Sequence, residues 1–335
     1  AVVTHAGGKK LDEPLVIRPT SETIMYDVFS KWIHSYRDLP LLINQWANVV
    51  RWEMRPRLFL RTVEFLWQEG HTVHATEAEA DIRARAMLEI YRDFAENIMA
   101  IPVIPGVKSE SEKFTGAFCT YTVEAMMQDG KALQFATSHN LGQNFAKVFD
   151  VKFLDKDGTE QYGWQTSWGL STRTIGGLIM VHSDDKGLVL PPKIASIQVI
   201  ITTITPFEKD RETINQKAQE INKKLKVFGI LSQVDARDIR PGEKYYEWEK
   251  KGVPVRVELG PKDIANDSAV IVRRDTGEKM KVRLDSIVET IDSVLNEIQI
   301  NLYNRALDYK KKKTKVVDTW DDFVKAIEEG NFVLA

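Results

Sequence analysis

The fold is decided by residues 44–53, NQWANVVRWE, and by their return over residues 59–71, FLRTVEFLWQEGH. Apolar and polar residues alternate on both sides of the short basic loop 54–57. This alternation predicts an antiparallel hairpin with one strand over 41–53 and the other over 59–69.

One face of this hairpin carries side chains that suit a nucleotide. Residues two apart on a strand share a face, which groups Arg51 with Glu53 and, on the return strand, Phe65, Trp67, Glu69 and His71. Arginine offers phosphate a forked donor, and an aromatic ring can stack on a purine. Taken alone, the pattern fits a solvated hairpin with cross-strand ion pairs equally well.

Two further segments hold polar groups beside apolar strands. Arg173 lies between glycines in residues 169–177, GLSTRTIGG, where a strand gives way to a helix. This is neither a phosphate-binding loop nor a dinucleotide fingerprint. Residues 137–143, TSHNLGQ, end an apolar strand and could line a pocket. Spacing alone favours a plainer interpretation, in which Thr137 or Ser138 caps a helix.

The rest of the chain divides at Pro191-Pro192. Before it, helices are expected over 20–33 and 77–101, the latter with Ile82, Ala86, Ile90 and Phe94 on its apolar face, and strands over 121–127, 132–138 and 162–170. This irregular order favours an antiparallel α+β sheet. After it, strands are expected over 199–203, 232–235, 253–259, 269–273 and 279–283, with helices over 207–228, 245–251 and 285–309. That alternation predicts a small α/β domain.

Composition excludes several classes of protein. The 335 residues are 43% hydrophobic and carry a formal net charge of −2, so no overall positive field points to a nucleic-acid partner. The single cysteine, Cys119, excludes a disulfide framework and a cysteine-rich zinc site within this chain, and it fits a reducing, cytoplasmic compartment. No apolar run is long enough to span a bilayer, so no membrane partner is expected.

Taken together, the segments closely resemble the prolyl-tRNA synthetase family of class II aminoacyl-tRNA synthetases, in its eukaryote- and archaeon-like form. The resemblance rests on residues 18–23, 44–53, 59–71, 137–145, 167–176, 187–192, 252–256 and 273–279, in the family's order. It implies an α+β class II antiparallel catalytic sheet with helices, followed by a smaller α/β anticodon-binding domain.

The resemblance also implies domain limits. Residues 1–192 would form the catalytic, adenylating domain, with its amino-terminal part and first motif missing. Residues 193–300 would bind the anticodon, and 301–335 would begin a carboxy-terminal domain that is cut short. The interval between His71 and Ser167 leaves no room for an editing domain.

The implied activity is that of a proline–tRNA ligase, which activates L-proline with ATP and Mg²⁺ and transfers it to tRNA(Pro). A homodimer in the cytoplasm is expected, without zinc in this chain. The alternatives are a synthetase for another amino acid and a catalytically silent paralogue that binds tRNA or regulates. Such paralogues typically lose the ATP arginines, whereas Arg51 and Arg173 are both present here.

Site roles follow from the resemblance residue by residue. Arg51 and Arg173 would be catalytic. ATP would be bound by Arg51, Glu53, Arg61, Thr62, Phe65, Gln134, Thr137, Ser171 and Arg173, with Gln134 acting through magnesium. Proline would be bound by Thr20, Glu22, Arg51, Trp67, Glu69, His71, Phe114, Ser138 and His139. Local positive charge for the anticodon would come from Arg237, Arg240, Lys244, Lys250, Lys251, Arg256 and Arg273, and base stacking from Tyr245, Tyr246 or Trp248.

Overall fold

A computed structural model describes residues 2–335, which form two compact units. The first contains the chain up to residue 94 together with 103–127 and 132–177, and the second contains 95–102, 128–131 and 178–335. The second unit therefore takes in residues 178–192, which the sequence assigned to the catalytic domain.

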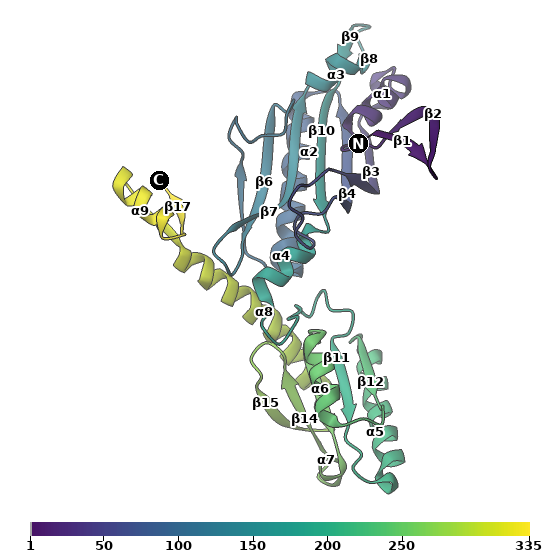
Figure 1. The fold of residues 1–335 in the computed structure, drawn as a ribbon, viewed down its shortest axis with the longest axis vertical. Coiled ribbons are helices and arrows are strands. Elements are labelled where there is room, and N and C mark those ends of the chain that lie inside the picture. The colour runs from purple at the N-terminus through teal and green to yellow at the C-terminus, as the bar shows by residue number, and fades with distance from the viewer. Residues whose placement is uncertain (1) are drawn as a thin grey trace. The chain divides into compact units, whose positions relative to one another are not determined.

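The first unit is built on a six-stranded antiparallel sheet (Figure 1). Its strands, in spatial order, are β3 (Leu41–Val50), β4 (Glu64–His74), β10 (Trp164–Ser171), β7 (Ala132–Gly142), β6 (Cys119–Met126) and β5 (Val103–Val107). The antiparallel sheet expected from the sequence is confirmed, although the limits of its strands differ from those expected. The return strand begins at Glu64, not at 59, and β7 runs on to Gly142 instead of ending at 138.

One face of this sheet is covered by the long helix α2 (Glu77–Asp93). The apolar face expected from the sequence is wrong, because Ile82 and Ile90 are 68% and 53% exposed. The helix instead turns Ala80, Ala84 and Leu88 inward. Alanine lets the helix backbone approach the sheet closely, and this close approach decides which face is buried.

Several shorter elements complete the first unit. Helix α1 (Glu22–Trp32) and helix α3 (Asn144–Phe149) share an apolar core in which Tyr26 meets Phe145 edge to face, with ring centroids 5.5 Å apart. The sequence did not predict the two-stranded ribbon β1 (Val2–Ala6) and β2 (Lys9–Val16), or the pair β8 (Lys152–Leu154) and β9 (Glu160–Tyr162). Helix α4 (Arg173–His182) follows β10.

The second unit contains a five-stranded mixed sheet, as the sequence predicted. Its strands, in spatial order, are β12 (Ser232–Asp235), β11 (Val199–Thr203), β13 (Val255–Leu259), β14 (Ser268–Arg273) and β15 (Lys279–Arg283), of which the first three are parallel. Its helices are α5 (Glu208–Val227), α6 (Pro241–Lys250), α7 (Pro261–Ala265) and α8 (Ile287–Lys313). All five residues of β11 are buried, as expected of a parallel strand covered on both faces.

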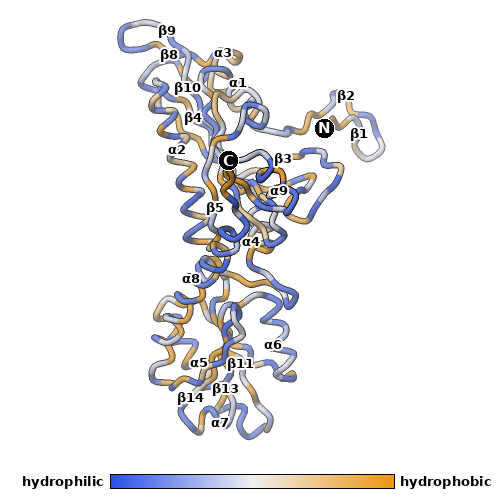
Figure 2. The backbone as a smooth tube through the Cα atoms, turned by 90° about the vertical axis from the view of Figure 1, so that its left-hand side faces the viewer, coloured by the Kyte–Doolittle hydropathy of each residue, from blue (hydrophilic) through white to orange (hydrophobic). Residues whose placement is uncertain are grey.

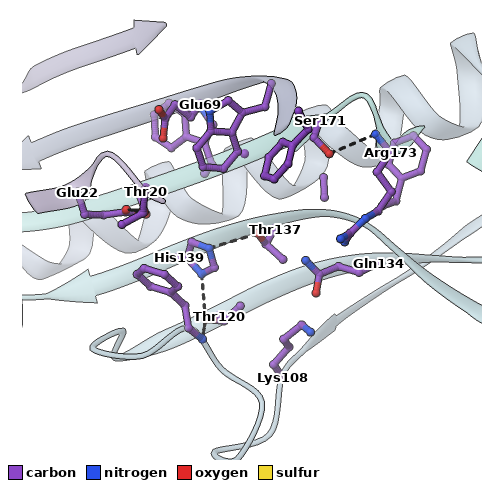
Figure 3. A pocket seen from close by; sticks show the side chains of 18 of the residues that line it. Thr20, Glu22, Glu69, Lys108, Thr120, Gln134, Thr137, His139, Ser171 and Arg173 are labelled. Atoms are coloured by element: carbon purple, nitrogen blue, oxygen red, sulfur yellow. Dashed lines mark hydrogen bonds between the residues drawn. The ribbon is translucent and has the colours of Figure 1, made fainter. Parts of the chain in front are cut away.

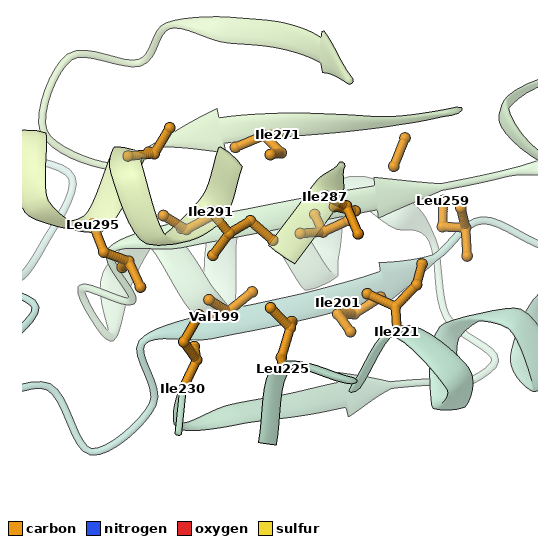
Figure 4. Close-up of a cluster of buried hydrophobic side chains, with 14 of the residues drawn as sticks. Val199, Ile201, Ile221, Leu225, Ile230, Leu259, Ile271, Ile287, Ile291 and Leu295 are labelled. Carbon is orange, nitrogen blue, oxygen red and sulfur yellow. The ribbon is translucent and has the colours of Figure 1, made fainter. Parts of the chain in front are cut away.

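A large apolar cluster between the sheet and two helices holds this unit together, and a smaller one joins Ile200 to Trp248 and Val253. Val199 and Ile201 of β11 pack with Leu225 of α5 and with Ile291 and Leu295 of α8 (Figure 4). Figure 2 shows the same hydrophobic colouring along β11 and β13. After α8 the chain forms β16 (Thr314–Val316), α9 (Trp320–Glu328) and β17 (Phe332–Leu334), which the sequence did not predict. Within residues 2–335, no helix is both long and apolar enough to cross a membrane.

Candidate active site

A cavity of about 300 Å³ opens on the sheet face opposite α2 in the first unit (Figure 3). It is lined from β4, β6, β7 and β10, from the start of α1 and the segment before it, from the start of α4, and from the connections between β3 and β4 and between β5 and β6. Its residues are Thr20, Glu22, Arg51, Phe65, Trp67, Glu69, Lys108, Glu112, Phe114, Thr120, Gln134, Phe135, Ala136, Thr137, His139, Ser167, Trp168, Gly169, Ser171 and Arg173.

Two buried carboxylates lie in this cavity. Glu22 is 5% exposed and accepts hydrogen bonds from Thr20 and, at 3.3 Å, from the Ser167 hydroxyl. Glu69 is 1% exposed, and in the described part of the chain neither carboxylate has a lysine or arginine within ion-pair distance. Buried carboxylates without a paired cation create a site for a positively charged ligand.

Glu69 is held ionised by its neighbours. Its Oε1 accepts from Ser21 and Gln45, and its Oε2 lies 3.1 Å from the His71 Nε2. Burial alone would raise the pKa of Glu69, but the hydrogen bonds from His71, Ser21 and Gln45 outweigh it and lower that pKa. The carboxylate therefore keeps its negative charge inside the protein.

Arg51 directs its guanidinium along an aromatic wall. Its Nε donates to the Pro19 carbonyl at 2.9 Å, and its Cζ lies 5.4 Å from the Phe65 ring centroid and 5.7 Å from that of Trp67. Glycine at 169 makes room for this wall, because a Cβ there would stand 3.1 Å from the Trp67 ring.

Arg173 shares the cavity with Arg51. Its Nε donates to the Leu60 carbonyl at 3.0 Å, which fixes the side chain at the start of α4. Burial, together with the nearby charges of Arg61 and Arg51, lowers the pKa of Arg173. Guanidinium groups that repel each other across a cavity create a site for an anion.

A neutral histidine forms part of the wall. His139 accepts or donates through both ring nitrogens, at 3.0 Å to Thr120 and 3.2 Å to Thr137, and its ring lies 4.8 Å from that of Phe114. Burial, with the charges of Lys108 and His71, lowers the pKa of His139 to about 4. The imidazole is therefore uncharged at neutral pH and offers shape and hydrogen bonds without adding charge.

The structure brings most of the predicted site residues together. Those that line the cavity are Thr20, Glu22, Arg51, Phe65, Trp67, Glu69, Phe114, Gln134, Thr137, His139, Ser171 and Arg173. The shared face of Phe65, Trp67 and Glu69 follows the strand alternation used to predict it.

Five predicted residues do not line this cavity. Ser138 is on the opposite sheet face, where its hydroxyl donates to the Ala84 carbonyl of α2 at 2.8 Å. His71 is fully buried behind Glu69. Glu53, Arg61 and Thr62 belong to the loop between β3 and β4, and the Arg61 Nη1 lies 3.8 Å from the Glu53 Oε2.

Sequence reasoning missed Lys108, Glu112, Thr120 and Ser167, which also line the cavity. Ser167 could have been found from strand parity, because it lies two residues from Gly169 and four from Ser171 on β10. Lys108 and Glu112 lie in a charged connection whose local sequence carries no signal of a pocket.

Family comparisons agree with this geometry. Residues 6–182 match the model of the tRNA synthetase class II core domain (G, H, P, S and T), and residues 198–293 match that of the anticodon binding domain. The fold and the cavity are therefore those of a class II aminoacyl-tRNA synthetase.

Comparison with individual relatives shows to which family within this class the chain belongs. The chain is 57% identical over 332 residues to a proline–tRNA ligase of Chloroherpeton thalassium, covering 98% of this chain and 69% of the relative. It is 58% identical over 337 residues to that of Chlorobaculum tepidum, covering 100% and 69%. Against the Parabacteroides distasonis enzyme the identity is 56% over 327 residues, covering 97% and 66%. The chain belongs to the proline–tRNA ligase family.

Proposed function

We propose that this chain activates L-proline with ATP and transfers the prolyl group to tRNA(Pro). The observation that carries the proposal is a single cavity that holds two guanidinium groups and two buried acidic side chains, Glu22 and Glu69. Thr20 and Glu22 lie toward one end of this cavity and Arg173 toward the other (Figure 3). This separation of charge suits an amino acid whose ammonium lies at the acidic end and a nucleotide whose phosphates lie at the arginine end.

The chemistry requires charge and position more than proton transfer. The proline carboxylate attacks the α-phosphorus of ATP, so two anions must approach each other. Arg51 and Arg173 offset their repulsion and bind the charge that develops on the phosphate. A carboxylate is already a nucleophile, so the neutral His139 need not act as a base.

Glu22 and Thr20 bind the ammonium end of proline. Glu22 uses two hydroxyl donors and retains acceptor capacity, whereas Glu69 already accepts from three groups. Trp67, Phe114 and His139 enclose the ring of the substrate. The secondary ammonium therefore contacts Glu22, and Glu69 adds negative charge behind it.

The nucleotide lies on the side of the cavity that holds Phe65, and Mg²⁺ is bound to its phosphates when it enters. Among the described residues no group of three or more His, Cys, Asp or Glu side chains could hold a metal ion. The Gln134 amide oxygen offers one ligand, and magnesium commonly takes its others from phosphates and water. Bound in this way, the ion would neutralise phosphate charge.

The second unit is proposed to read the anticodon. A cleft of about 210 Å³ within it is lined by Lys186, Arg256, Arg273, Arg274, Lys279, Trp248 and Glu249. Unstacked anticodon bases can be bound by cations that contact the phosphates and by polar groups that hydrogen-bond to the edges of the bases. Of the side chains predicted for this role, Arg256, Arg273 and Trp248 line the cleft, whereas Lys244 is buried and donates to the Thr203 carbonyl at 2.9 Å.

Homodimerisation is supported by an exposed apolar surface on the first unit. Leu42 and Trp46 of β3 are 47% and 83% exposed, and Leu66 of β4 and Ile175 of α4 are 63% and 41% exposed. A second copy that covered this surface would remove apolar area from water. The same function assigns the protein to the cytoplasm, where tRNA is charged.

Proline-dependent exchange of pyrophosphate into ATP tests the activation step. Wild type is expected to exchange with proline and not with threonine. Arg51→Ala is expected to lose at least about 100-fold in rate, because it removes a preorganised charge. Arg55→Ala, on the same loop but outside the cavity, is the matched control. Wild type that binds tRNA without exchange would favour the silent paralogue, and faster exchange with alanine or threonine would contradict the substrate assignment.

A further inference from the structure

Lys108 is the third cation in the cavity, and the proposed roles above leave it unused. It follows β5, and its backbone N–H donates to the Thr120 carbonyl at 2.9 Å, so the residue continues the strand pairing. Arg51 follows β3, which is the opposite edge strand of the sheet. The two cations therefore enter the cavity from opposite sides.

The charge of Lys108 is poorly compensated. Its side chain is 14% exposed, and the acidic group recorded beside it is the Glu112 carboxylate, whose Oε2 is 3.9 Å from the Nζ and whose side chain is 72% exposed. The nearby Lys113 differs, because its Nζ lies 2.7 Å from the Glu110 Oε2 and it does not line the cavity. A mostly buried ammonium needs an anion close by.

The position of Lys108 limits which anion this is. Figure 3 shows its amine directed toward Gln134, on the side of the cavity that also holds Arg173, whereas Thr120 and His139 lie on the other side of Lys108. The side chain thus stands between the predicted nucleotide residues and the wall of the proline pocket. The groups that meet there are the α-phosphate and the carboxylate that attacks it.

We propose that Lys108 is a catalytic residue of proline activation, whose ammonium contacts the α-phosphate opposite Arg51. This inference rests on the proposed function. A proline carboxylate oxygen forms a bond to the α-phosphorus while the bond from that phosphorus to the oxygen bridging to the β-phosphate breaks. The electron pair of the broken bond leaves with pyrophosphate. Lys108 transfers no proton and stabilises the negative charge that accumulates on the α-phosphate oxygens.

Steady-state exchange kinetics test this role through the split between kcat and KM. Lys108→Met is expected to lower kcat about 100-fold, the typical loss when one preorganised donor to a developing charge is removed. KM for proline and for ATP should stay within about threefold, because an interaction made mainly in the transition state does not contribute to ground-state binding. Lys108→Arg keeps the positive charge, and its kcat should be at least tenfold higher than that of Lys108→Met.

The controls separate the possible outcomes. Lys113→Met removes a neighbouring lysine outside the cavity and should match wild type within about twofold. Lys108→Gln is measured in parallel, and circular dichroism melting confirms that each variant is folded. An unchanged kcat in folded Lys108→Met or Lys108→Gln, or a raised KM alone, overturns the inference. Absence of exchange in wild type would instead overturn the proposed function.

Discussion

The cavity depends on side chains that do not line it. Glu69 is ionised inside the protein because Ser21 and Gln45 donate to one of its oxygens while His71 approaches the other. Gln45 also donates to the Ser21 hydroxyl at 3.2 Å, which ties the two donors together. The strand β3 thus contributes to the site through Gln45, although it carries no acidic residue itself.

Gln45→Leu should therefore weaken proline binding at acidic pH. Loss of one donor raises the pKa of Glu69 above its present, lowered value, so the carboxylate becomes neutral at a higher pH as the solution is acidified. The charge that attracts the proline ammonium is then lost earlier. KM for proline should rise about tenfold for one charged hydrogen bond, and the acidic limb of kcat/KM should move to higher pH.

The control for this variant is Gln161→Leu, which removes a similar side chain from β9 far from the cavity. If Gln45→Leu leaves the pH profile of kcat/KM for proline unchanged, then Gln45 does not position the Glu69 carboxylate.

At the residue scale, the sequence predicted on which face of a strand a side chain lies better than it predicted the role of that side chain. Strand parity correctly joined Phe65 to Glu69, because alternation depends only on backbone geometry. Ser138 was assigned to the proline pocket by the resemblance to the family, while the strand was expected to end at this residue. Once β7 continues through it, parity turns its hydroxyl to α2. Lys108 could not be found, since its place in the cavity depends on the order of the strands in the sheet.

At the scale of elements, the long regular segments were predictable and their limits were not. The helix over 207–228 follows from strong helical periodicity and the strand over 199–203 from a short run of β-branched residues, and both were confirmed within a residue. The loop between β3 and β4 is longer than expected because it folds on itself, with Arg57 and Arg61 exchanging backbone hydrogen bonds. The positive φ of 58° at Phe59 is a tertiary feature that no local propensity reveals.

A test of element packing is Gly70→Ala in the middle of β4. A Cβ at this position would stand 2.1 Å from the Trp168 ring, and neither the paired strand nor the indole, which is 8% exposed, has room to move. Overpacking of this kind costs about 1–3 kcal/mol. Urea denaturation should show that loss in the first unit.

Gly106→Ala on the edge strand β5 is the matched change, because an added Cβ meets nothing there within 4 Å. Equal stability of the two variants would contradict the tight contact between Gly70 and Trp168.

At the scale of the whole molecule, each unit contains histidines that burial keeps neutral. Burial lowers the pKa of His74 and of His139 in the first unit to about 4. It does the same for His182 in the second unit, whose Nε2 pairs with the Met99 carbonyl at 3.0 Å and whose own carbonyl accepts from Arg305. In mild acid these histidines therefore stay unprotonated in the folded state, whereas the same histidines are protonated in the unfolded chain.

Both units should therefore lose stability in mild acid. Above the unfolded histidine pKa of about 6.5, both states are neutral and no effect is present. Between about 6.5 and 4 the unfolded state binds more protons, so the free energy of unfolding falls as pH falls, by up to about 1.4 kcal/mol per pH unit for each such histidine. Below about pH 4 the folded histidines titrate too, and this contribution stops growing.

His182→Gln isolates the contribution of one histidine, because glutamine can donate to the Met99 carbonyl but does not titrate. Hydrogen exchange of the β11 and β13 amides, measured at pH 7 and at pH 5 and corrected for intrinsic rates, reports the opening free energy of the second unit alone. The wild type should lose more of this free energy than the variant between the two values, since only the wild type carries the histidine whose protonation favours the open state. Equal losses would mean that His182 does not cause the acid sensitivity of this unit. The same comparison on the β4 amides should be unaffected by the substitution, because His74 and His139, not His182, set the acid response of the first unit.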